Sequence, residues 1–178
     1  HPGYDWMSLG RALVANVSPG SVREGGGTIT MQHARNTVLT SEKTLRRKLK
    51  EVFLAMRLER EYSKQEILTL YLNRIFLGQR AYGIGAASEV YFDKSVHDLT
   101  VAEAALIAGL PRSPSLDNPV ASSTRAHDRR AYVLRRMLEL GKIDQAGHDA
   151  ALDAPISSRL HGPIIELDAP YVDEMVRA

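Results

Sequence analysis

The chain has 178 residues, of which 44% are hydrophobic and 25% are charged, with a formal net charge of +2. This length and composition fit a globular fold with a sizeable core and exclude an intrinsically disordered chain. The sequence has no cysteine, which excludes disulfides, thiolate zinc sites and a cysteine nucleophile.

Hydrophobic residues recur at helical spacing along most of the chain, which predicts a mostly α fold. We expect a first helix over residues 5–17 and a glycine-rich loop, REGGGTIT, over residues 23–30. Consecutive glycines allow a backbone to approach a ligand closely. A long helix is expected over residues 41–62. Its predicted core stripe consists of Leu45, Leu49, Val52, Phe53 and Met56.

Two capping boxes mark further helix starts, because Glu66 follows Ser63 and Glu103 follows Thr100 at the required spacing. The first is expected to open a helix that extends through Phe76. Other helices are expected over residues 83–91, 101–110, 123–140 and 144–152, with an extended proline-containing loop over 111–119 and a linker after residue 154.

Glu51 is the first candidate for chemistry. In helical projection, Arg47, Lys48, Leu54 and Ala55 are its neighbours one turn away. The cations favour an ionised carboxylate, whereas the apolar side chains disfavour it. Such opposing surroundings are typical of functional carboxylates. The alternative is an ordinary ion pair between residues one turn apart on a solvated helix face.

A cationic set is the second candidate. It consists of Arg35, Lys43, Arg46, Arg47, Lys48 and Lys50. Next to the glycine-rich loop, these residues are suited to grip a phosphate group through charge and backbone N–H donors. The alternative is a solvated basic face. The loop lacks the Gly-Lys-Ser/Thr ending of a nucleotide-hydrolase phosphate loop.

Other classes of function are disfavoured by spacing. The six histidines show no pair with the spacing of a zinc site, and mostly surface positions are expected for them. Ser113 and Ser115 have no histidine nearby in sequence to act as a base. Nucleic-acid binding is disfavoured because the cations alternate with apolar positions and no recognition motif is present.

Several stretches carry a family resemblance, in this order: GGGTITMQHARN, RRKLKEVFLAMRLE, SKQEILTLYLNRIFLGQRAYGIGAASEVYFDKS and LTVAEAALIAGLPRSPSLDNP. Together they resemble glycosyltransferase family 51, the lysozyme-like helical module of class A penicillin-binding proteins. The resemblance implies a peptidoglycan glycosyltransferase domain over residues 1–154, truncated at its N-terminus. Residues 155–178 would then be a linker toward a C-terminal penicillin-binding domain, since APYVDEMVRA resembles that junction.

The resemblance also assigns site residues. The family's general base belongs to a motif whose end resembles His1-Pro2-Gly3, so it is expected upstream of His1, outside this sequence. A second catalytic glutamate matches Glu51, near the donor's pyrophosphate. Gly27 stands where the family usually has serine, which predicts weaker donor binding and the same reaction. The substrate-binding positions implied are Gly26, Gly27, Thr28, Gln32, Arg35, Lys43, Arg47, Lys48 and, less clearly matched, Lys50.

The implied activity is that of an inverting hexosyltransferase that polymerises lipid II into glycan strands in bacterial cell-wall biosynthesis. The base would take a proton from the acceptor's 4-hydroxyl, and the cations would stabilise the departing undecaprenyl pyrophosphate. The resemblance allows a divalent cation, Mg²⁺ or Mn²⁺, as cofactor. The expected partners are lipid II, the growing glycan strand and the membrane surface, and a transpeptidase domain in the parent chain. The expected location is the extracytoplasmic, periplasmic face of the bacterial cell membrane.

Two alternatives stay open at this point. A lysozyme-like lytic enzyme would share the fold but would need no grip for a pyrophosphate, so the cationic set argues against it. A non-catalytic module that binds glycan or lipid II is the other alternative, because the expected base lies outside this sequence.

Overall fold

The computed structural model describes residues 27–38, 45–157 and 159–161, with the backbone alone given for residues 37, 38 and 45–49. Within these ranges the chain forms helices, turns and a single isolated β-bridge, which confirms the mostly α prediction. The expected helix over 5–17 lies outside the described residues. The chain divides into two compact units, His1–Ile84 and Gly85–Ala178. The expected boundary at residue 154 stays a prediction.

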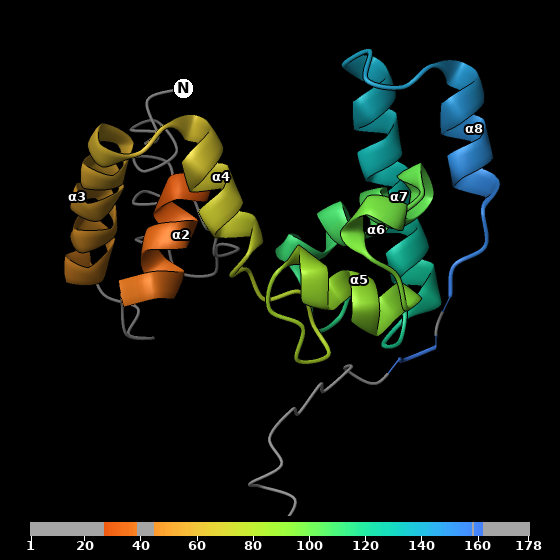
Figure 1. Cartoon of the computed structure of the whole chain (residues 1–178), viewed down its shortest axis with the longest axis horizontal. Helices are drawn as coiled ribbons and strands as arrows, with labels where there is room; N and C mark the ends of the chain where they lie inside the picture. The colour runs from red at the N-terminus through yellow and green to blue at the C-terminus, as the bar shows by residue number, and fades with distance from the viewer. Residues whose placement is uncertain (1–26, 39–44, 158, 162–178) are drawn as a thin grey trace, which may run out of the picture. The chain divides into compact units, whose positions relative to one another are not determined.

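The described part of the first unit contains α2 (Ile29–Val38), α3 (Leu45–Glu61) and α4 (Lys64–Leu72). Figure 1 shows α2 between the other two helices, and α2 packs against both. Its small core joins Met31 of α2 to Val52 and Ala55 of α3. Helix α2 was not predicted from the sequence, because the expected glycine-rich loop extended to residue 30.

Helix α3 confirms the long helix expected in this region but not its whole core stripe. Glu51, Val52 and Ala55 are buried, whereas Phe53 is 70% exposed. Successive residues of a helix differ by about 100° in direction, so the side chain after Val52 leaves the buried face. The prediction that Phe53 belongs to the core was therefore wrong: it shares the outer face of α3 with exposed Lys50 and Arg57.

Helix α4 begins as predicted, with Ser63 and Glu66 forming a capping box. It ends at Leu72, so the expected extension through Phe76 was wrong. Residues 75–83 instead form a tight turn in which Phe76 pairs with Tyr82 in an antiparallel bridge. The turn closes at Gly83, whose N–H donates to the carbonyl of Ile75 at 2.8 Å.

The second unit is built on helices α5 (Ile84–Phe92), α6 (Val101–Gly109), α7 (Ser123–Glu139) and α8 (Gln145–Asp153). Short 3-10 turns occupy Val96–Asp98 and Leu110–Arg112. The second predicted capping box, Thr100 with Glu103, is confirmed. Helix α7 packs against α6 and α8 around a core of Ala102, Ala105, Leu134 and Ala151.

The proline-containing loop after α6 is folded back on itself and is not extended as predicted. Asp117 and Asn118 are buried in it. The Asn118 amide donates to the carbonyls of Pro114 and Ser115, and its oxygen accepts from the N–H groups of Val120 and Ala121. The Asn118 side chain therefore satisfies four backbone groups of the loop, beside the backbone hydrogen bonds that Leu116 and Asp117 donate to the Ser113 carbonyl.

Gly83 offers a test of the turn after α4. Its φ is +86°, and an added Cβ would lie 2.6 Å from the Asn73 carbonyl oxygen. Gly83→Ala is therefore expected to lower the free energy of unfolding by about 1–3 kcal/mol. Gly85→Ala is the control, because a Cβ there meets nothing within 4 Å. It should raise stability by up to about 1 kcal/mol. Urea unfolding measures both, and equal effects would contradict the assignment of strain to Gly83.

Candidate active site

Glu51 lies on the buried face of α3, with 1% of its surface exposed. It stands next to Val52 and one turn before Ala55, the two α3 residues that pack against Met31 of α2. The solvated helix face that the alternative required is thus wrong for this carboxylate. A carboxyl group is rarely buried to this degree without hydrogen bonds or charge partners. The Glu51 side chain is therefore a carboxyl group that the surrounding protein shields from water.

The N-terminus of α2 is built by Gly27 and Thr28. The Thr28 hydroxyl accepts from the N–H of Met31 at 3.2 Å, and its carbonyl accepts from the N–H of Gln32 at 2.9 Å. The first turn of α2 contains no acidic residue. Because a helix N-terminus carries partial positive charge, this end of α2 suits an anion, and the Glu59 carboxylate of α3 already accepts a hydrogen bond from Thr30 in this turn.

Gln32 links the glycine-rich loop to α4. Its amide nitrogen donates to the carbonyl of Gly27 at 3.3 Å, and its amide oxygen accepts from the Tyr71 hydroxyl at 3.3 Å. Tyr71 is 6% exposed and is a buried residue of α4. Tyr71 was not predicted from the sequence, because nothing in its local pattern separates it from a core tyrosine.

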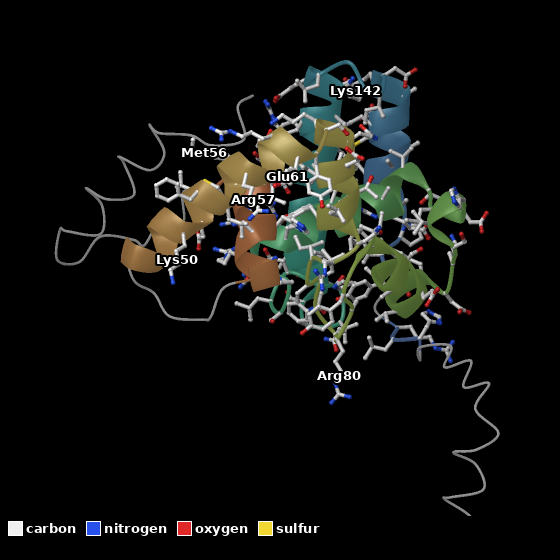
Figure 2. The ribbon with its side chains drawn as sticks, turned by 60° about the vertical axis from the view of Figure 1, so that its left-hand side comes forward. Lys50, Met56, Arg57, Glu61, Arg80 and Lys142 are labelled. Atoms are coloured by element: carbon white, nitrogen blue, oxygen red, sulfur yellow. The ribbon has the colours of Figure 1, made fainter. Side chains whose placement is uncertain are left out.

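The other substrate-binding predictions stay predictions. Arg35 and Lys50 are exposed, and Figure 2 shows Lys50 extending away from the ribbon. Exposed cations are accessible to an anion, but Lys50 leaves α3 on a different face from buried Glu51. Gly26 and Lys43 lie outside the described residues. Arg47 and Lys48 lie in α3, in the turn before Glu51, and their side chains lie outside the described part.

A hydrogen-bonded network that was not predicted from the sequence connects α2, α3 and α4 of the first unit. Glu59 of α3 accepts hydrogen bonds from the hydroxyl of buried Thr30 in α2 and from the ammonium group of Lys64 in α4. Burial opposes ionisation of Glu59, yet these hydrogen bonds outweigh burial and hold its pKa below the ordinary value. The charged form of Glu59 therefore stabilises this arrangement.

His33 is buried in α2, whereas the other described histidines are exposed or partly exposed, as expected for most of them. Burial lowers the pKa of His33, and the positive charge of Arg74 lowers it further. The imidazole is thus held neutral at physiological pH, and we assign it no chemical step.

In the part of the chain that the structure describes, no three His, Asp or Glu side chains gather into a metal-binding group. Among the same residues, no helix combines the length and apolarity needed to cross a bilayer.

Comparison with known proteins gives consistent matches. The sequence model described as transglycosylase matches residues 1–138. The chain is 49% identical over 178 residues to penicillin-binding protein 1A of Pseudomonas aeruginosa, covering 100% of this chain and 22% of that protein. It is 52% identical over 178 residues to penicillin-binding protein 1A of Vibrio cholerae, with the same coverage. The chain thus spans 22% of the length of these relatives.

A solved structure is also similar to this chain. The crystal structure of penicillin-binding protein 1A from Haemophilus influenzae matches with a TM-score of 0.52 and 41% sequence identity. The match covers 84% of this chain and 19% of that chain.

The Glu59 network predicts a pH dependence. Because the folded pKa of Glu59 lies below 4.5, its stabilising contribution is present above pH 4.5 and lost as pH falls through the folded value. Lys64→Met should lower the free energy of unfolding by about 0.5–1 kcal/mol at pH 7, and the difference from the wild type should shrink below pH 4.5.

Arg57→Met is the matched control, because the Arg57–Glu61 pair is exposed on both sides and contributes little. Urea unfolding from pH 3 to pH 7 measures both variants. A Lys64→Met effect that does not change with pH would show that the charge of Glu59 does not carry it.

Proposed function

Because the chain belongs to the transglycosylase family, we propose that it is the catalytic module of a peptidoglycan glycosyltransferase. The enzyme polymerises lipid II into glycan strands and releases undecaprenyl pyrophosphate. The observation that supports the proposal most is the burial of Glu51 on α3, the helix that packs against α2. The lytic enzyme and the non-catalytic module are not favoured by the matches to penicillin-binding protein 1A.

The reaction is a displacement at C1 of the donor's N-acetylmuramic acid. The 4-hydroxyl oxygen of the acceptor's N-acetylglucosamine forms the new bond, and the bond from C1 to the pyrophosphate oxygen breaks. The hydroxyl proton passes to the carboxylate that the family resemblance places before His1. The leaving pyrophosphate keeps the electron pair, so negative charge grows on its bridging oxygen in the transition state.

The α2 N-terminus is proposed to receive this growing charge. The first turn of α2 is fixed in advance, with the Met31 N–H held by the Thr28 hydroxyl, so its dipole would cost little reorganisation when charge develops. Arg35 and Lys50, which are exposed, are proposed to attract the anionic donor. Their contribution to the rate is expected to be smaller than that of groups held in a water-excluded site.

Glu51 is proposed to organise cations rather than to contact the pyrophosphate directly. Two anionic groups repel each other in a poorly solvated site unless positive charge lies between them. Arg47 and Lys48 precede Glu51 by one helical turn, the spacing at which side chains meet on a helix. A buried carboxylate in this position would hold such cations ready for the donor before it binds.

The divalent cation stays a prediction of the family resemblance. The described residues contain no group of three carboxylates or histidines, so a protein cage is not what they fit. They fit a Mg²⁺ or Mn²⁺ ion held chiefly by the substrate's phosphates. When bound, the ion would neutralise charge on the leaving group.

The proposed function also implies a longer parent protein, a membrane location and specific partners. Since the chain spans 22% of relatives named penicillin-binding protein 1A, we propose that a transpeptidase domain follows it in the parent protein. A lipid-linked substrate requires a membrane surface, and we propose the extracytoplasmic face of the bacterial cell membrane. Lipid II and the growing glycan strand are the proposed partners.

Glu51→Gln tests the proposal in the full-length protein that contains this chain. The neutral amide keeps the shape of the side chain but no longer holds cations, so the polymerisation rate is expected to fall at least ~100-fold. Labelled lipid II in detergent with Mg²⁺ gives the rate, and gel electrophoresis gives the strand length.

Glu61→Gln is the control, because Glu61 is exposed on the same helix and its ion pair with Arg57 is exposed as well (Figure 2). It should change the rate less than about twofold. Cleavage of preformed strands by the wild type, with no polymerisation, would replace the transferase by the lytic enzyme.

Chelation tests the cation separately. Removal of divalent ions with EDTA should raise the KM for lipid II by roughly tenfold, and Mn²⁺ should restore it. Electron paramagnetic resonance should detect bound Mn²⁺ with lipid II present and little without it, because the substrate's phosphates supply most ligands. Tight Mn²⁺ binding by the protein alone would contradict this arrangement.

A further inference from the structure

The contact between Tyr71 and Gln32 joins residues 39 apart in sequence, one on α4 and one on α2. It continues through the Gln32 amide nitrogen to the Gly27 carbonyl at the start of the site. Tyr71, Gln32 and Gly27 therefore form a relay of two hydrogen bonds that ends in the glycine-rich loop. Neither contact was predicted from the sequence.

The relay fixes which way the Gln32 amide points. A carbonyl oxygen only accepts, so the group facing Gly27 must be the amide nitrogen. The amide oxygen then faces α4, and the Tyr71 hydroxyl, which can donate or accept, must donate. Without that donor, the buried end of the amide has no hydrogen bond to hold its rotamer.

When its amide is oriented in this way, Gln32 can still donate one hydrogen bond to a ligand. An amide nitrogen has two hydrogens, and the Gly27 carbonyl uses one of them. Among the described contacts the second hydrogen has no acceptor, and Gln32 is half-buried in the first turn of α2. A neutral donor at a helix N-terminus suits a phosphate oxygen.

Tyr71 is suited to remain a donor. Burial raises the pKa of the Tyr71 hydroxyl, and the nearby positive charge of Arg35 opposes that rise only in part. The hydroxyl therefore keeps its proton at neutral pH and in mildly alkaline assays. Arg35 is itself a predicted substrate-binding residue. Tyr71 of α4 therefore lies near two predicted substrate-binding residues, Gln32 and Arg35.

We propose that Tyr71 is a positioning residue that acts through Gln32, turning the second amide hydrogen of Gln32 toward a pyrophosphate oxygen of the lipid-linked donor. This inference rests on the proposed function, because it needs Gln32 to contact that donor. It assigns a role in donor recognition to a side chain of α4 that touches no substrate itself.

Tyr71→Phe tests the inference in the full-length protein, because it removes the hydroxyl and keeps the buried ring. The KM for lipid II is expected to rise about threefold to tenfold with kcat changed less than twofold, since ground-state positioning is lost. Gln32→Ala should raise KM at least as much. In the double variant, Tyr71→Phe should add nothing, because the residue it acts through is gone.

Tyr62→Phe is the matched control, because Tyr62 is an exposed tyrosine in the same unit. It should leave KM and kcat unchanged. Independent, multiplying effects of Tyr71→Phe and Gln32→Ala would overturn the inference, as would a Tyr71→Phe enzyme with the KM of the wild type. A purely structural role would lower the melting temperature and the active fraction without this dependence on Gln32.

A second measurement separates this inference from the proposed function. The Gln32 side-chain amide resonances of the substrate-free protein should be sharp in the wild type and averaged by rotation in Tyr71→Phe. Unchanged resonances overturn the positioning role even where polymerisation is normal. A wild type that orders Gln32 but does not polymerise lipid II overturns the proposed function, and with it the role toward pyrophosphate.

Discussion

The packing of α2 between α3 and α4 is the constraint on which the candidate site depends. The described core of this contact includes the buried residues Met31, Val52 and Ala55. Hydrophobic burial favours the association of the helices but leaves their relative rotation weakly specified. Because Glu51 lies beside this core, any rotation of α3 would carry its carboxylate off the buried face.

Polar contacts help to specify how the three helices are rotated relative to one another. Glu59 accepts hydrogen bonds from a hydroxyl of α2 and from an ammonium group of α4. Tyr71 of α4 donates a separate hydrogen bond to Gln32 of α2. Hydrogen bonds between partly buried groups are directional, so they tolerate little change in helix register. These polar side chains therefore help to arrange the three helices, and their contacts include Gln32, a residue assigned to the donor.

The sequence predicts features that are encoded locally. Both capping boxes lie within four residues, and both form as expected. Helix α2 was missed because its sequence, ITMQHARNTV, has a weak apolar pattern and follows three glycines. Phe53 was placed wrongly, since periodicity alone does not decide which side of a stripe faces a partner. Glu51 was a candidate from its cationic and apolar neighbours and was assigned by the family resemblance, whereas its burial and the role of Tyr71 depend on partners distant in sequence.

The loop between α6 and α7 has a consequence for handling the protein. Serines, prolines and an asparagine in a stretch between helices usually indicate a place where proteases cut and where tags can be inserted. Here the Asn118 side chain occupies two carbonyls and two N–H groups of that stretch, and Arg125 holds Asp117 from the next helix. A protease needs an extended strand, which this loop cannot supply without breaking those bonds. Limited digestion should therefore spare it, and affinity tags are better placed elsewhere.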